Sequence, residues 1–305
     1  MHIATKTLAA INDGLMIDQG SKYRGLLRKA MPLAEDAYSE AEDEFRSHLG
    51  ASLIGRECGR ELWYSFRWST KKQFDGRMLR LFNRGHLEEP RFVALLQMIG
   101  CTVYQHDAKG KQFRIEGYKG HFGGSLDAVI VDCPDYLGHP ILGEFKTHGE
   151  KSFLKLKSEG VLKSKWEHFV QMQIYMGENK LDAAIYMAVN KNTDEIHAEI
   201  VMFDNGVYQR YLDRAVMIVD SSNPPPPLPN ASAGWFACKF CDHIQVCHNP
   251  QATPIRNCRT CKYSLLFSGG TWVCSVDCVS LVDLPKKKQL IGCDRYQMNP
   301  GMKKP

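Results

Sequence analysis

The sequence contains no long apolar run. Nowhere in its 305 residues do about 18 consecutive apolar residues occur, the length that a transmembrane helix requires, so we expect no membrane-spanning segment. The first residues, Met1 to Lys6, also lack the apolar core of a secretion signal. We therefore expect a cytoplasmic protein.

A strong excess of charge of one sign is missing as well. The formal net charge of +5 does not by itself identify a nucleic-acid-binding protein. The distribution of charge says more, because one stretch of twenty residues carries six lysines against Glu150 and Glu159. This stretch can follow the phosphates of a nucleic acid or form a solvated surface, and the sequence leaves both interpretations open. The lysines are Lys146, Lys151, Lys155, Lys157, Lys163 and Lys165.

Cysteine, in contrast, is abundant. The chain has 11 cysteines, and disulfides are rare in the reducing cytoplasm, so another role is expected. Most of them lie close together, between Cys238 and Cys293. Dense cysteines in such a compartment usually provide thiolate ligands for zinc or iron.

The order of apolar patterns predicts an α/β protein with a mixed sheet flanked by helices. Pro90 interrupts the second helical region, which predicts either a kink or two helices. The expected helices cover residues 1–50, 52–99, 166–176 and 207–219, and the expected strands cover 113–117, 126–131, 141–146, 183–190 and 195–203. Four parts follow along the chain: a helical segment (1–50), a core (51–220), a proline-rich linker with a cysteine triplet (221–252) and a cysteine-rich module (253–305).

One predicted hairpin carries three residues suited to phosphodiester chemistry. Glu144 and Lys146 lie two residues apart in a strand, so their side chains share a face, while Phe145 packs behind them. If Cys133 lies opposite Pro140, Asp127 of the preceding strand lies near Lys146, unless a bulge shifts the register by one or two residues. Two carboxylates can hold Mg²⁺ or Mn²⁺, and the lysine can orient a water molecule or stabilise negative charge.

Two helical segments add polar residues to this hairpin. The segment from Arg84 to Pro90 supplies a carboxylate that can complete a metal site, with His86 as an additional candidate ligand. Further along, Gln171 and Tyr175 are four residues apart and share one face of the helix predicted over residues 166–176.

This order of motifs resembles the RecB-like and λ-exonuclease-like (YqaJ-type) branch of the PD-(D/E)XK nucleases. The resemblance covers about residues 52 to 203 and implies a restriction-endonuclease-like fold. It implies Lys146 as the catalytic lysine, with Gln171 and Tyr175 positioning DNA or the active-site groups. Leu126 stands where the superfamily name has proline. The metal ligands that it implies are Glu89, Asp127, Glu144 and the carbonyl of Phe145, with Glu88 as the alternative to Glu89.

A second resemblance concerns Cys58 together with the cysteine triplet of Cys238, Cys241 and Cys247. Cys58, within Gly55-Arg56-Glu57-Cys58-Gly59, resembles the first cysteine of RecB-like exonucleases, including AddB, that carry a [4Fe–4S] cluster. The resemblance implies a structural cluster that joins the two ends of the nuclease domain. Zinc on the same residues, or on the triplet with His243 or His248, is the alternative. The implied cluster ligands are Cys58, Cys238, Cys241 and Cys247.

The last fifty residues have the form of a zinc ribbon. A C-x₂-C pair is followed by three further cysteines, and a segment this small needs a metal to fold. The predicted zinc ligands are Cys258, Cys261, Cys274 and Cys293, with Cys278 as the alternate for Cys274.

Together these features predict a metal-dependent DNA nuclease. Within the resembled family, exonucleases that process DNA ends in recombination or repair are commonest, and many are encoded by phages, so we expect an exonuclease. An endonuclease of the same fold, a non-catalytic nucleic-acid-binding protein and a redox- or iron-sensing regulator are the alternatives. A recombination or replication protein is the kind of protein partner that such an enzyme would have, and the sequence leaves strand polarity and oligomeric state open.

Overall fold

The computed structural model describes residues 1–38, 45–249, 251–276, 279–280 and 286–302. Its contacts divide the chain into two compact units. Unit 1 comprises the described parts of residues 1–42, 74–115 and 125–208, and unit 2 those of residues 43–73, 116–124 and 209–305. Among the described residues, no helix is long and apolar enough to cross a membrane.

Unit 1 is built on a five-stranded mixed sheet with the strand order β2-β5-β6-β7-β8. β6 and β7 are parallel, whereas the other neighbouring pairs are antiparallel. The interior strand β7 is buried along its whole length, as expected for a strand covered on both faces. The strands are β2 (Thr102–Tyr104), β5 (Ala128–Val131), β6 (Ile141–His148), β7 (Ala183–Asn190) and β8 (Ile196–Met202).

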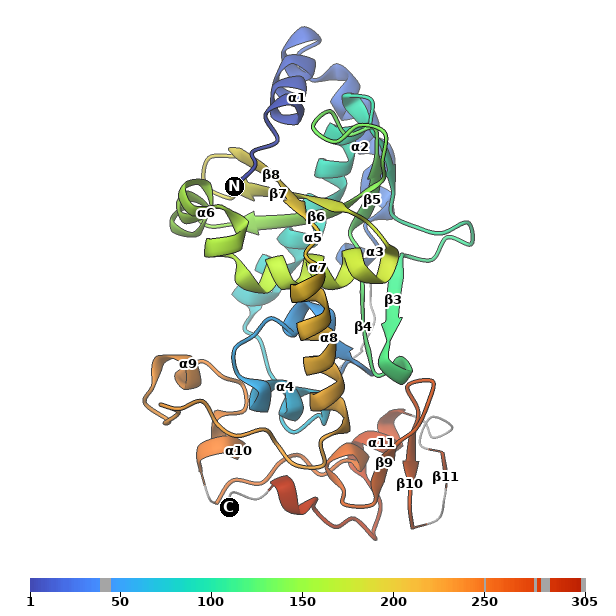
Figure 1. Ribbon diagram of the computed structural model, residues 1–305, viewed down its shortest axis with the longest axis vertical. Coiled ribbons are helices and arrows are strands. Elements are labelled where there is room, and N and C mark those ends of the chain that lie inside the picture. The colour runs from blue at the N-terminus through green and yellow to red at the C-terminus, as the bar shows by residue number, and fades with distance from the viewer. Residues whose placement is uncertain (39–44, 250, 277–278, 281–285, 303–305) are drawn as a thin grey trace. The chain divides into compact units, whose positions relative to one another are not determined.

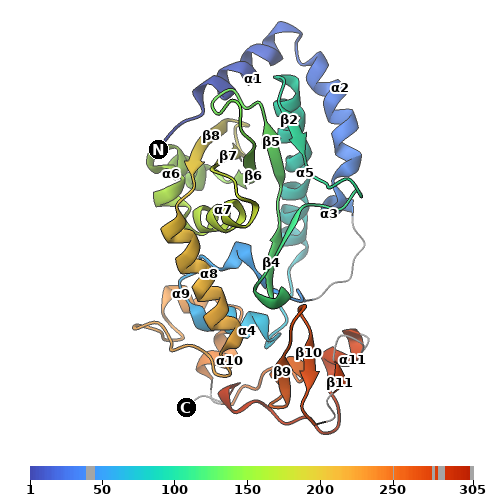
Figure 2. The same cartoon turned by 45° about the vertical axis from the view of Figure 1, so that its right-hand side comes forward.

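Helices cover both faces of this sheet (Figures 1 and 2). On one face, α1 (Thr5–Ile17) and α5 (Gly76–Met98) pack with alternate strand residues such as Phe145 and Met187 in the apolar core. On the other face lie α6 (Glu150–Ser164) and α7 (Trp166–Asn179). The remaining helices of this unit are α2 (Ser21–Ala30) and α3 (Glu35–Tyr38).

The α/β class, with a mixed sheet flanked by helices, is confirmed. The helix break is elsewhere than expected, because α5 continues through Pro90 and the interruption falls between α4 (Gly59–Phe66) and α5. The lysine-rich stretch, for which the sequence analysis predicted no element, forms α6. A helix is possible there because lysine is a good helix former and because Phe153 and Leu156 supply a buried face.

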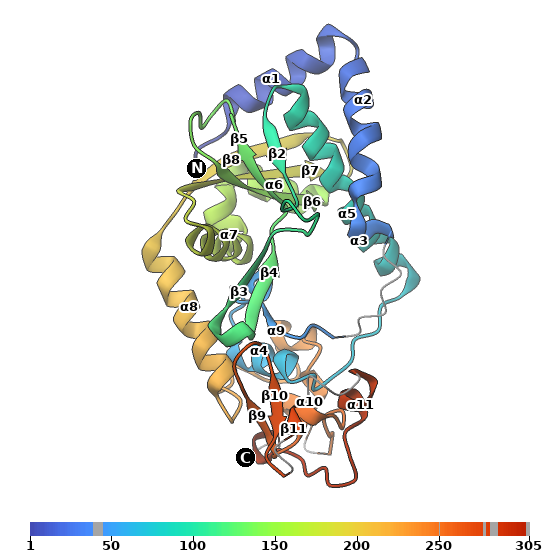
Figure 3. The ribbon, with the colours of Figure 1, turned by 90° about the vertical axis from the view of Figure 1, so that its right-hand side faces the viewer.

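Unit 2 contains small elements held by an aromatic and cationic core. Arg259 lies 3.8 Å from the ring centroid of Trp68 and donates hydrogen bonds to the carbonyls of Phe66 (3.1 Å) and Ser47 (2.8 Å). Figure 3 shows its β9-β10-β11 sheet. Its elements are β1 (Leu49–Gly50), α4, α9 (Phe236–Lys239), α10 (Ile244–His248), β9 (Ser264–Leu266), β10 (Trp272–Cys274), β11 (Val279–Ser280) and α11 (Lys286–Ile291). β3 (Arg114–Gly117), β4 (Phe122–Ser125) and α8 (Asn205–Asp220) include residues of both units.

Candidate active site

The β5–β6 hairpin differs from the predicted register by two residues. Ala128 pairs with Gly143, so Asp127 lies opposite Glu144 rather than Lys146. Residues 132–140 connect the two strands, and within this connection the backbone N–H of Tyr136 donates to the carbonyl of Cys133 at 2.8 Å. A shift of two residues keeps every side chain on its predicted face, since side chains alternate with a period of two.

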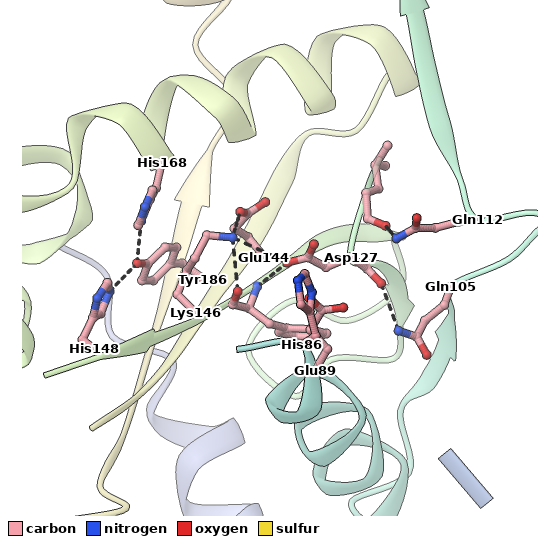
Figure 4. Close-up of polar contacts among 12 residues, drawn as sticks. His86, Glu89, Gln105, Gln112, Asp127, Glu144, Lys146, His148, His168 and Tyr186 are labelled. Atoms are coloured by element: carbon pink, nitrogen blue, oxygen red, sulfur yellow. Dashed lines mark hydrogen bonds and ion pairs between the residues drawn. The ribbon is translucent and has the colours of Figure 1, made fainter. Parts of the chain in front are cut away.

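Lys146 lies between the two carboxylates (Figure 4). Its ammonium forms an ion pair with Glu144 and lies 3.8 Å from an oxygen of Asp127. Burial alone would lower the pKa of Lys146, but the charges of Glu144 and Asp127 raise it above its ordinary value. The side chain therefore remains a cation at neutral pH. Burial raises the pKa of Glu144, which Lys146 partly offsets.

Phe145 packs the hairpin against α5. Its ring stacks on Phe92 of α5 with centroids 5.2 Å apart, as expected for a side chain behind the Glu144 and Lys146 face. Its backbone N–H donates to Asp127 at 2.8 Å, and its carbonyl accepts from Lys146 at 3.2 Å. The carbonyl thus lies at the cluster, where the sequence resemblance would use it as a ligand.

Helix α5 brings a third carboxylate to the hairpin. Burial raises the pKa of Glu89, and the nearby charges of Asp127 and Lys146 also act on it. His86 lies one turn earlier, 3.8 Å from Glu89. Glu88 interacts instead with Arg91, at 3.5 Å. Glu89 is therefore the one of these two neighbours that belongs to the cluster.

Gln171 and Tyr175 of α7 are buried over the same face of the sheet. Burial, followed by the negative charges of Glu144 and Asp127, raises the pKa of Tyr175. The Tyr175 hydroxyl also has a hydrogen bond with Gln171. The structure thus brings both residues to the carboxylates, and the roles assigned to them remain predictions.

The sequence analysis missed a buried hydroxyl beside Lys146. Tyr186 of β7 lies opposite Glu144 in the register, and its hydroxyl is 2.8 Å from Nε2 of His148 and 2.9 Å from Nδ1 of His168 (Figure 4). Burial lowers the pKa of His148 to about 4 and that of His168 to about 3. Both imidazoles are therefore neutral near Lys146. The one signal in the sequence was the spacing of two residues between Lys146 and His148, which puts both side chains on the same face of their strand.

Among the described residues, no group of three or more His, Cys, Asp or Glu side chains is arranged as a finished metal site. The chemistry of the cluster nevertheless suits a hard cation. Neither carboxylate oxygen of the fully buried Glu144 has a hydrogen-bond partner, although one is ion-paired with Lys146. Carboxylate and carbonyl oxygens are the donors that Mg²⁺ and Mn²⁺ prefer.

In unit 2, the first cysteine set begins with Cys58, which directly precedes α4. Burial raises the pKa of Cys58, and that of Cys241 to about 12; Cys58 also acts electrostatically on Cys241, and Cys247 on Cys58. Cys238 joins the set through the turn in which the N–H of Cys241 donates to its carbonyl at 3.0 Å. His243, the alternative ligand, has both ring nitrogens within 2.8 Å of the Ser65 and Thr70 hydroxyls.

The second cysteine set surrounds one hollow. A turn like that of the first set joins its first two members, because the N–H of Cys261 donates to the carbonyl of Cys258 at 3.2 Å. Burial, and then the other three thiols, raise the pKa of Cys258 to about 11. Cys278, the alternate ligand, lies outside the described residues. The four cysteines that line the hollow are Cys258, Cys261, Cys274 and Cys293.

No protein-family model and no curated protein matches the sequence. Among solved structures, an alkaline exonuclease (LHK-Exo) from Laribacter hongkongensis is 14% identical, with a TM-score of 0.40 over 57% of this chain and 86% of its own. The same enzyme in complex with dAMP gives a TM-score of 0.42 at 14% identity over 59% and 91%. The structure of SSO0001 is 18% identical, with a TM-score of 0.37 over 75% of this chain and 97% of its own. At such identities and TM-scores, a likeness does not establish a shared activity.

Proposed function

We propose that unit 1 hydrolyses phosphodiester bonds of DNA with the help of Mg²⁺ or Mn²⁺. One observation carries this proposal: Lys146 contacts carboxylates from two adjacent strands, Asp127 and Glu144, and a third carboxylate, Glu89, approaches from α5. Desolvation makes a largely buried cation costly, so a lysine that is fixed among carboxylates is a candidate functional group. Phosphodiester hydrolysis uses both charges, because it needs a bound cation and a stabilised anionic transition state.

The residues divide this work by their chemistry. Asp127, Glu144, Glu89 and the carbonyl of Phe145 would hold the metal ion, with His86 beside Glu89. When bound, the metal ion supplies Lewis-acid activation of the phosphate and of the attacking water. Lys146 donates hydrogen bonds to negative charge that develops on the phosphate oxygens, or orients the water. Gln171 and Tyr175 would position the substrate or the carboxylates.

The reaction mode is proposed from the order of the motifs. It resembles that of λ-exonuclease-like enzymes, so we propose an exonuclease that processes DNA ends in recombination or repair. An endonuclease would use the same residues. A non-catalytic binding protein is the weaker candidate, because the cluster of Asp127, Glu144 and Lys146 would serve no purpose in it.

The test is digestion of end-labelled linear DNA and closed circular DNA in the presence of Mn²⁺, comparing the wild type with Lys146→Ala. Lys155→Ala on α6 is the matched control. Degradation of linear DNA alone, abolished only by Lys146→Ala, is the expected result. Cleavage of circles that also depends on Lys146 would make the enzyme an endonuclease. A folded wild-type protein that cleaves neither substrate would refute the catalytic proposal.

We further propose that the two cysteine sets bind different metals. The first set would hold a [4Fe–4S] cluster, with zinc as the alternative, and the second set would hold Zn²⁺. Burial raises the pKa of the Cys58, Cys241 and Cys258 thiols, so metal binding at these residues must release protons. Anaerobic purification followed by iron, sulfide and zinc analysis tests this assignment. Four irons and one zinc per chain are expected, whereas zinc alone would overturn the cluster.

A further inference from the structure

Two cationic side chains of unit 1 are held next to each other. Arg84 lies on α5, and Lys191 directly follows β7. The guanidinium of Arg84 donates to the backbone carbonyl of Lys191 at 2.9 Å. Burial, and then the charge of Arg84, lower the pKa of the Lys191 ammonium, as expected for two cations in proximity.

The strand arrangement brings this pair to the candidate active site. β6 and β7 are parallel, so their carboxyl ends meet at one edge of the sheet. The backbone N–H of Lys191 donates to the carbonyl of His148, two residues beyond Lys146, at 2.8 Å. Lys191 lines the same hollow as His86, Glu89 and Lys146. The pair therefore lies at the border of the carboxylate cluster.

Carboxylates act on this pair only from beyond ion-pair distance: the charge of Arg84 lowers the pKa of Glu88, which burial raises. In the described parts of the chain, neither Arg84 nor Lys191 forms an ion pair with an acidic residue. The exposed lysines of α6 differ, because Lys155 lies 3.8 Å from Glu159 and Lys157 lies 2.5 Å from Glu195. The mutual repulsion of Arg84 and Lys191 would be relieved by an anion with more than one oxygen, such as a phosphate.

We propose that Arg84 and Lys191 together bind one phosphate of the DNA strand, next to the phosphate that is cleaved. The inference rests on the proposed nuclease function, and it adds the residues that set the position of the strand. The planar guanidinium offers paired N–H donors, and the ammonium adds a point charge. The basic stretch recognised in the sequence, now α6, would not be the principal DNA contact.

DNA binding is measured by fluorescence anisotropy with a labelled oligonucleotide, without added Mg²⁺ or Mn²⁺ so that metal-dependent cleavage does not occur, between about 50 and 200 mM salt. The variants are Lys191→Gln, Arg84→Gln and the double variant, with Lys155→Gln as the matched control. Each single variant should weaken binding roughly three- to tenfold and reduce the salt slope by about 0.7 to 0.9, the value for one phosphate. The double variant should lose no more slope than that, because both side chains contact the same phosphate. Arg84→Lys should retain the salt slope.

Unchanged affinity and salt slope in all variants would overturn the inference. A double variant that loses twice the slope of each single variant would also overturn it, because the two side chains would then bind two separate phosphates. Thermal unfolding confirms that the variants are folded. If only the proposed nuclease function is wrong, the wild type will bind DNA but leave it intact in the presence of Mn²⁺. A wild type that does not bind DNA at all would overturn both.

Discussion

The carboxylate of Asp127 accepts a hydrogen bond from the backbone N–H of Phe145 at 2.8 Å. This bond joins the residue that directly precedes β5 to the middle of β6, and the same carboxylate lies 3.8 Å from the ammonium of Lys146. The same carboxylate therefore has a structural partner and a candidate metal-binding role, and substitutions can separate the two.

Asp127→Asn keeps an oxygen that can accept from Phe145 but removes the charge. We expect its thermal stability to stay close to wild type while DNA cleavage falls by about 10²–10³-fold. Asp127→Ala loses both functions and should also cost about 1–3 kcal/mol in the free energy of unfolding, because the Phe145 N–H loses its partner. Denaturation and cleavage assays measure the two effects. Full cleavage by Asp127→Asn would exclude a role for the charge.

The two histidines around Tyr186 should make unit 1 sensitive to acid. Burial holds the pKa of His148 at about 4 and of His168 at about 3, below the ordinary value of 6.5. The unfolded chain takes up protons near pH 6.5 that the folded chain does not, so their stabilisation is full above pH 6.5 and is lost as the pH falls toward 4. His168→Gln should flatten this loss by on the order of 1–2 kcal/mol near pH 5.

Unfolding curves recorded at several pH values test this expectation. His139→Gln, at an exposed position, controls for the loss of an imidazole as such. A pH dependence of His168→Gln identical to that of the wild type would show that the buried imidazole is not the source of acid sensitivity.

Removing one ligand of the second cysteine set should release its metal. Cys258→Ser is expected to lose about one zinc per chain and to expose the C-terminal segment to protease, because small metal-bound modules seldom fold without the metal. Cys101→Ser, at a buried cysteine of unit 1, is the control and should keep the zinc. Equal zinc content in the two variants would contradict the proposed site. Elemental analysis and limited proteolysis give the answer.

A close backbone contact in unit 2 predicts a sharp steric effect. A Cβ atom on Gly120 would lie 2.5 Å from the backbone nitrogen of Gly270, and Gly120 has a φ of +78°. Gly269 has a similar φ of +69°, but its nearest atom would lie 3.9 Å away. Gly120→Ala should therefore be about 1–3 kcal/mol less stable than Gly269→Ala, which carries only the backbone strain. Equal stabilities, measured by chemical denaturation, would show that the contact can relax at no cost.

The chain by itself determined the local features of this protein. The period of two in residues 141–146 put Glu144 and Lys146 on one face and Phe145 on the other, and even a register error of two residues left these faces unchanged. The expected strand over residues 183–190 agrees with β7, because a run of this length that contains Ile185, Tyr186 and Val189 favours a strand over a helix. Helix interruption was less predictable, since packing of Phe92 and Leu96 holds α5 continuous through Pro90.

Only the tertiary structure decided which distant residues meet. The resemblance favoured Glu89 but left Glu88 open, and the different neighbours of the two residues follow from the rotation of α5 against the sheet. Tyr186 reaches His148 through the parallel pairing of β6 and β7, whereas its contact with His168 and that of Lys191 with Arg84 depend on how α7 and α5 pack on the sheet. Local pattern determines the face on which a side chain lies. The packing of separate elements determines what it touches, and no spacing along one segment records that.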